Sequence, residues 1–176
     1  MGNGSPQQPH RPRSAHVLAA QPALVPLGEP SPAVFLNILV GIDGSPSSRR
    51  ALEYAVEIAR AGNAKLTLMT VAPTASTYVT LAGMSMERMD AELDEWARKT
   101  LDEAQSMVPD EVVAHTVQGR GHAGPELVKE LQRGGYDLIV VGSRGRGRTQ
   151  EGLLGSVNGY VHFHAHVPLL SAPDAR

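Results

Sequence analysis

The sequence predicts an α/β domain built on a five-stranded, doubly wound parallel sheet with helices on both faces. Three observations lead to this prediction. Two almost continuous apolar runs, at residues 35–42 and 137–141, are typical of buried strands in a parallel sheet. Segments with apolar residues at helical spacing alternate with the strand-like segments, which indicates crossover connections. The length of 176 residues is sufficient for one such domain with its own core.

The first strand and helix follow directly from local signals. The apolar run 35–42 ends at Asp43, and Ser45 then stands where a helix N-cap is expected, with Pro46 at the first helical position. Apolar residues at spacings of three and four continue until Gly62, which ends the helix. The segment therefore predicts a strand, a tight turn and a helix, which is half of a βαβ unit.

The middle of the chain continues the same alternation. We expect a strand at 66–71, a long loop at 74–83, a third strand at 112–117, a glycine-containing connection at 119–124 and a short helix at 125–133. A further helix precedes the third strand, and its apolar stripe is expected to pack in the core. That stripe consists of Met86, Met89, Leu93, Trp96, Leu101 and Ala104.

The last part of the chain holds the second strongly apolar strand, 137–141, a glycine-rich loop, a helix near 156–165 and a weak fifth strand at 168–172. The two most apolar strands are expected to lie side by side at the centre of the sheet. Ligands in such sheets bind beyond the carboxyl ends of the strands, where the strand order reverses. Asp43 and Gly142, at the ends of the two strands, should therefore face one crevice.

Residues 1–34 are rich in proline and have no apolar period, so we expect a disordered N-terminal tail. An organelle transit peptide is the alternative, because Arg11 and Arg13 precede the first acidic residue, Glu29. The folded domain is expected to cover residues 35–172, followed by a short C-terminal tail at 173–176.

Composition excludes several classes of function. Lys and Arg total 16 against 18 for Asp and Glu, so the charge balance does not predict a nucleic-acid partner. The absence of cysteine excludes a thiolate nucleophile and cysteine-based metal sites, and it fits a reducing cytoplasm. The longest apolar stretch falls far short of the roughly 18 to 20 residues that span a bilayer, so no membrane partner is expected.

The residues most informative about chemistry lie in the loop 142–156, where five of fifteen residues are glycine. Glycine permits positive φ and close approach of a ligand, and successive backbone N–H groups in such a loop form a concave anion site. Gly155 and Ser156 open the last helix, whose N-terminus can hold further phosphate. Asp43, across the crevice, is positioned to accept a hydrogen bond from a ribose hydroxyl or a base.

Two familiar phosphate motifs fit the loop incompletely. The P-loop spacing is present, but Arg148 replaces the required lysine. A dinucleotide fingerprint fails because Gln150 stands where glycine or alanine is needed. The alternative that the loop is a plain surface connection that binds nothing stays open.

The spacing that does fit is G-x2-G-x9-G-S, formed by Gly142, Gly145, Gly155 and Ser156. It resembles the nucleotide-binding signature of the universal stress protein family. The resemblance extends over about residues 35–172 and includes the opening strand through Asp43. It implies a Rossmann-like fold of the adenine nucleotide alpha-hydrolase type, a homodimer, and ATP as ligand, with or without Mg²⁺.

Carried over by position, the resemblance implies that Asp43 lies near the adenosine and that Val71 helps to form the adenine pocket. It also implies that Gly142, Gly145, Gly155 and Ser156 hold the phosphates. The C-terminus departs from the family pattern, because the last strand is not rich in valine, and this concerns the dimer-forming edge more than the nucleotide site.

Together with these residues, the resemblance implies an ATP-binding regulatory stress protein with no catalytic residues. Two alternatives stay open: an enzyme that transfers a phosphoryl or nucleotidyl group, and a nucleotide-free dimerisation module of the same fold. The loop arginines, Arg144 among them, either neutralise phosphate or are simply solvated. No metal site is expected, since of the three histidines 162, 164 and 166 only the outer two share a helix face.

Overall fold

The structure is a computed structural model, and it describes residues 1, 35–74, 85–145 and 155–173. Contacts divide the chain into Met1–Pro30 and Ser31–Arg176, and every helix and strand described here lies in the second unit. The expected tails and most of the expected loop 74–83 fall outside the described residues. The elements are β1 (Asn37–Gly41), α1 (Pro46–Gly62), β2 (Lys65–Ala72), α3 (Met86–Ser106), β3 (Ala114–Arg120), α4 (Ala123–Gly134), β4 (Leu138–Gly142), α5 (Ser156–His164) and β5 (Leu169–Ala172).

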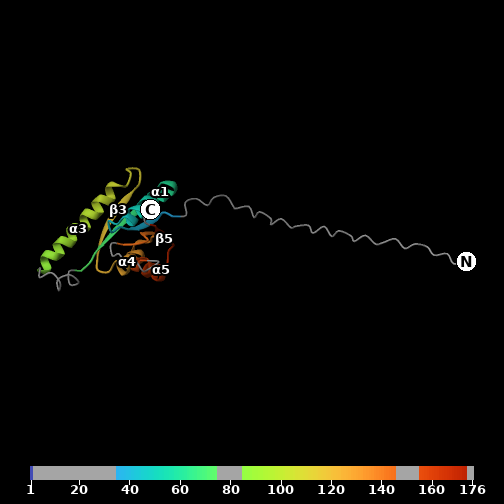
Figure 1. Ribbon diagram of the computed structural model, residues 1–176. Coiled ribbons are helices and arrows are strands. Elements are labelled where there is room, and N and C mark those ends of the chain that lie inside the picture. Colours follow the sequence, from blue (N-terminus) through green and yellow to red (C-terminus); the bar gives the residue numbers. More distant parts are fainter. Residues whose placement is uncertain (2–34, 75–84, 146–154, 174–176) are drawn as a thin grey trace. The chain divides into compact units, whose positions relative to one another are not determined.

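The five strands form one sheet, with helices packed around it (Figure 1). Their order is β3-β2-β1-β4-β5, and all four neighbouring pairs are parallel. The chain moves outward from β1 to β3 and then crosses back to β4, so the order reverses between β1 and β4. In their register, Leu39 lies beside Ile139 and Gly41 beside Val141. The predicted central pair is therefore confirmed, and the carboxyl ends of these two strands form the switch point of the sheet.

Helices α1 and α3 cover one face of the sheet, and α4 and α5 cover the other. Alternation along β1 sends Ile38 and Val40 into the first core and Leu39 into the second. The helical side of the first core includes Leu52 and Leu101, and that of the second includes the residues Leu127, Val128, Leu131 and Val161. The predicted doubly wound α/β fold is confirmed.

The turn between β1 and α1 is the local structure that the sequence predicts. The Ser45 side chain accepts a hydrogen bond from the backbone N–H of Ser48 at 3.2 Å, so Ser45 is the N-cap. Pro46 is the first helical residue, and Gly44 adopts φ +77°, a value that favours glycine. This turn carries the chain directly from the end of β1 past Asp43 into α1.

The third strand lies two to three residues later than predicted. β3 begins at Ala114, not Val112, and it includes Gly119 and Arg120, which were expected in a loop. The reason is that β3 is an edge strand with exposed side chains at His115, Thr116 and further along, so it lacks an apolar run. Pairing with β2 fixes its limits instead. Helix α4 begins at Ala123, two residues earlier than predicted, with His122 as its N-cap.

The expectation that the whole apolar stripe of α3 packs in the core is wrong for its first half. Met86 is 53% exposed, and the fully buried residues of the helix begin only at Ala97. A helix of 21 residues is about 31 Å long, so it extends beyond what the sheet can cover. Arg120 at the end of β3 forms ion pairs with Asp90 and Asp94 along this less buried half.

No helix within the described part of the chain is long and apolar enough to cross a membrane.

Candidate functional site

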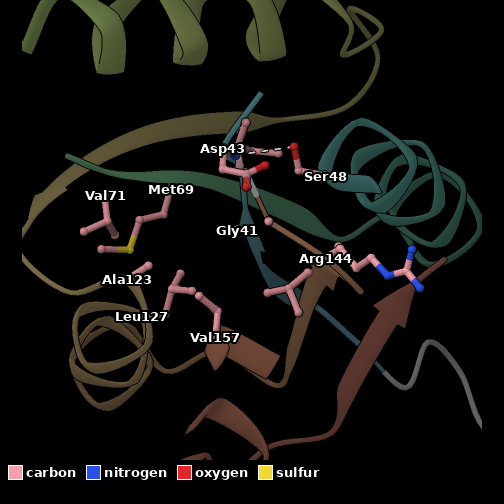
Figure 2. A pocket seen from close by; sticks show the side chains of 13 residues that line it. Gly41, Asp43, Ser48, Met69, Val71, Ala123, Leu127, Arg144 and Val157 are labelled. Carbon is pink, nitrogen blue, oxygen red and sulfur yellow. Dashed lines mark hydrogen bonds between the residues drawn. The ribbon is translucent and has the colours of Figure 1, made fainter. Parts of the chain in front are cut away.

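A pocket opens at the carboxyl ends of β1, β2 and β4, where the strand order reverses (Figure 2). Its empty space, open solvent at its mouth included, is about 510 Å³. Residues from both faces of the sheet and from the start of the glycine-rich loop line it. They are Gly41, Ile42, Asp43, Ser48, Met69, Val71, Ala123, Leu127, Val141, Gly142, Arg144, Gly145 and Val157.

One side of the pocket is apolar. Met69 and Val71 project from the end of β2, Leu127 from α4 and Val157 from the first turn of α5, and Figure 2 shows them around one hollow. Gly119 of the neighbouring strand β3 lies behind Met69, and an added Cβ there would be 2.7 Å from the Met69 methyl group. The absence of a side chain at that position lets Met69 occupy its present place, and the surface suits a flat apolar group.

The other side of the pocket is polar and centres on Asp43. The Asp43 carboxylate accepts a hydrogen bond from the Ser45 N–H at 3.0 Å, and the Asp43 N–H donates to the Ser48 hydroxyl at 3.4 Å. A Cβ at Gly145 would lie 3.1 Å from Asp43 Oδ2. The start of the glycine-rich loop therefore runs directly beside the carboxylate.

The two ends of the glycine-rich loop meet. The Gly155 N–H donates to the Ser143 carbonyl at 3.2 Å, and the Ser143 N–H donates to the Ala172 carbonyl of β5. Gly155 is the N-cap of α5, which has no capping side chain and begins at Ser156 as predicted. Residues 146–154 lie outside the described part, so the P-loop near match and two of the loop arginines fall there.

Close contacts, not positive φ angles, explain why glycine occupies the described positions of the signature. The expectation of positive φ in this loop is wrong for Gly142, Gly145 and Gly155, since none of them is among the positive-φ residues. A Cβ at Gly142 would lie 2.6 Å from Ser47 Oγ and 2.8 Å from the backbone of α1. Glycine is required there because α1 begins against the end of β4.

The predicted site residues are only partly brought together. Asp43, Val71, Gly142 and Gly145 line the pocket. Gly155 and Ser156 stand at the far end of the loop and do not line the pocket. Gly155 is connected to the start of the loop by its hydrogen bond to Ser143. Sequence reasoning missed Met69, Leu127 and Val157, and the signal that could have found Met69 is its place two residues before Val71 on the same face of β2.

The histidines near the C-terminus make local contacts. His164 Nδ1 lies 2.8 Å from the Tyr160 carbonyl, and the His164 ring stacks on the Tyr160 ring at 4.1 Å. Within the described ranges, no three His, Cys, Asp or Glu side chains are grouped closely enough to hold a metal ion.

The sheet is parallel and is covered by helices on both faces, and a half-apolar pocket lies at its switch point beside the start of the glycine-rich loop. These features define the class of α/β proteins that bind ligands at the carboxyl ends of their strands. Comparison with known proteins makes the class specific. Residues 35–173 match the universal stress protein family, and the chain belongs to that family.

Three similar proteins illustrate the relationship. Universal stress protein YxiE of Bacillus subtilis (strain 168) is 32% identical over 145 residues, which cover 78% of this chain and 98% of that protein. The solved structure of hypothetical protein MJ0577 superposes with a TM-score of 0.71 at 22% identity, covering 81% of this chain and 99% of its own. A universal stress protein solved in complex with cAMP is 27% identical with a TM-score of 0.58 and the same coverage.

Proposed function

We propose that this universal stress protein binds ATP in the pocket at the switch point and acts as a nucleotide-dependent regulatory factor in the stress response. The observation that carries the proposal is the contact between the two predicted halves of the site. Gly145, from the glycine signature, lies beside the Asp43 carboxylate at the mouth of an apolar pocket. The similar protein solved with cAMP supports an adenine nucleotide as the ligand class.

Each part of the nucleotide has a chemical counterpart in the site. The adenine ring would lie against Val71 and Met69, and Asp43 would accept a hydrogen bond from a ribose hydroxyl. The phosphates would follow the loop that begins after Gly142, from Gly145 toward Gly155 and Ser156, where the N-terminus of α5 favours negative charge. Bound Mg²⁺ would accompany the triphosphate and neutralise part of its charge.

Regulatory binding is favoured over phosphoryl or nucleotidyl transfer. Among the described residues that line the pocket, Asp43 is the one acidic side chain and Arg144 the one basic side chain. Metal-assisted in-line transfer uses a lysine or arginine clamp together with acidic or amide ligands for Mg²⁺. Steady-state ATP turnover comparable to that of ordinary kinases, which is about 1 to 100 per second, would establish the enzyme alternative instead.

Titration calorimetry with ATP, ADP and adenosine tests the proposal. We expect the purified protein to bind all three, and Asp43→Ala to weaken both adenosine and ATP by roughly tenfold to hundredfold, the loss typical of a hydrogen bond to a charged group. Asp110→Ala, an exposed carboxylate of the α3–β3 connection, is the matched control and should change neither affinity. Wild-type protein that binds none of the three would favour the nucleotide-free dimerisation module.

We also propose a homodimer that forms through β5, the edge strand next to β4. The carbonyls of Pro168 and Ala172 accept hydrogen bonds from the β4 side. Because alternate residues of a strand direct their backbone groups to opposite sides, those of Leu169 and Ser171 face away from the sheet. A row of outward-facing backbone groups at a sheet edge is suited to pairing with a second copy.

Light scattering at tens of micromolar, on the order of ordinary assay concentrations, tests the dimer. We expect a dimer for the wild type and for Ser171→Ala, and a folded monomer for Ser171→Pro, because proline removes the outward N–H without breaking a bond to β4. A monomeric wild type would exclude this interface, and a dimeric Ser171→Pro variant would place the interface elsewhere.

A further inference from the structure

The first turn of α1 is attached to the start of the glycine-rich loop by a serine that the signature does not contain. Ser47, the second residue of α1, is fully buried, and its hydroxyl donates a hydrogen bond to the Arg144 carbonyl. The Ser45 hydroxyl lies 3.2 Å from Ser47 Oγ and 3.5 Å from the same carbonyl. The Arg144 carbonyl is thus held by the N-terminus of α1, 97 residues earlier in the chain.

This contact depends on Gly142, which allows α1 to approach the end of β4. With a side chain at position 142, the Cβ would occupy the space of Ser47 Oγ, 2.6 Å away. Ser47 is therefore fixed between β4 and the loop, where its hydroxyl has a defined direction. Buried hydroxyl groups in such a place normally form a hydrogen bond, because leaving one unpaired is unfavourable.

Holding the Arg144 carbonyl also sets the direction of the next backbone N–H. The C=O of residue 144 and the N–H of residue 145 belong to one planar trans peptide, so they point in opposite directions. A carbonyl directed toward Ser47 turns the Gly145 N–H away from α1. Figure 2 shows the Arg144 side chain extending to the side away from Met69 and Val71, so this guanidinium does not face the apolar hollow.

The same hydrogen-bond chain reaches Asp43. The Asp43 carboxylate accepts from the Ser45 N–H at 3.0 Å, and Ser45 contacts Ser47, which holds Arg144. One turn of α1 thereby connects the carboxylate expected at the ribose with the peptide groups expected at the phosphates. Both parts of the site are oriented by the same short segment.

We infer that Ser47 is a positioning residue that orders the first peptide groups of the glycine-rich loop for phosphate binding. The inference rests on the proposed function for the identity of the ligand, and its structural part concerns the free protein. Ser47 does not touch the nucleotide; it acts through the Arg144 carbonyl. We therefore expect loss of the Ser47 hydroxyl to weaken binding of the phosphates more than binding of the base and ribose.

Binding measurements on hydroxyl variants test the ligand part. We expect Ser47→Ala to bind ATP about threefold to tenfold more weakly, the effect of one neutral hydrogen bond, and to bind adenosine within about twofold of the wild type. Ser47→Cys keeps a similar size and a weak S–H donor, so its ATP affinity should lie between those of the wild type and Ser47→Ala. The control is Ser106→Ala, which removes a serine hydroxyl that donates to the Glu103 carbonyl at 2.7 Å far from the site. Equal losses for ATP and adenosine would indicate a merely structural role and overturn the inference.

Backbone NMR relaxation of the ligand-free protein tests the structural part separately. Ser47→Ala should lower the order parameter of the Gly145 N–H from the rigid range near 0.85 toward the flexible range below about 0.6, with strand β1 unchanged. An unchanged Gly145 order parameter would overturn the inference even if ATP binds as proposed. A lowered one in a protein that binds no nucleotide would refute the proposed function and leave the attachment by Ser47 established.

Discussion

Replacing Gly145 with valine is expected to abolish ATP binding while leaving the fold intact. A Cβ at this position would lie 3.1 Å from Asp43 Oδ2, and the larger valine side chain would fill the space between the loop and the carboxylate. Gly145 is exposed and belongs to neither core. The substitution should therefore change the free energy of unfolding by no more than about 0.5 kcal/mol.

The ligand series distinguishes how the substitution acts. The sequence alone predicts the largest loss for the triphosphate, but the position of Gly145 next to Asp43 adds a loss for adenosine as well. We expect calorimetry to detect no ATP binding by Gly145→Val and weakened binding by Gly145→Ala. Wild-type ATP affinity in Gly145→Val would mean that the loop is only a connection and that the nucleotide-free module is correct.

The fold class could be predicted because its central elements carry strong local signals. β1 and β4 are nearly continuous apolar runs, and Ser45 with Pro46 marks the start of α1. The signals fail where tertiary context decides: β3 takes its limits from pairing with β2, and the first half of α3 has helical apolar spacing but extends past the surface it would cover. A spacing pattern states which residues share a face, not whether a partner covers that face.

The residues of the site also differ in how far the sequence could predict them. Asp43 and the glycines could be identified because Asp43 ends a central strand and the glycines have the spacing of a nucleotide-binding signature. Leu127 and Val157 could not be distinguished in sequence from ordinary core residues, since an apolar side chain facing a pocket and one facing the core look alike. Ser47 looks like any helix-start serine until the fold brings Arg144 to it.

Gly142→Ala is expected to destabilise the protein by about 3 kcal/mol, in the upper part of the range for an extra methyl group in a packed interior. The added Cβ would lie 2.8 Å from the carbonyl carbon of Ser47 and from the N atom of Ser48. These are backbone atoms of a capped helix, so they cannot move aside as a flexible side chain would. Urea unfolding followed by circular dichroism measures the loss.

The matched control is Gly159→Ala in α5, where an added Cβ meets no atom of the described residues within 4 Å beyond the backbone of its own helix. Alanine is favoured over glycine in a helix, so this variant should be more stable by about 0.5 to 1 kcal/mol. Opposite signs for the two glycine-to-alanine changes would show that the cost at Gly142 comes from the contact with α1. A Gly142→Ala variant as stable as the wild type would mean that α1 can retreat from β4.

Taken with Gly145→Val, the Gly142 result separates two uses of glycine within one signature. Gly142 stands at the end of a central strand and lets α1 begin against it, so its substitution should weaken folding first and nucleotide binding only as a consequence. Gly145 stands in the loop beside Asp43, so its substitution should weaken binding without weakening folding. Gly142→Ala that folds stably yet fails to bind ATP would contradict this division and assign Gly142 to the phosphates directly.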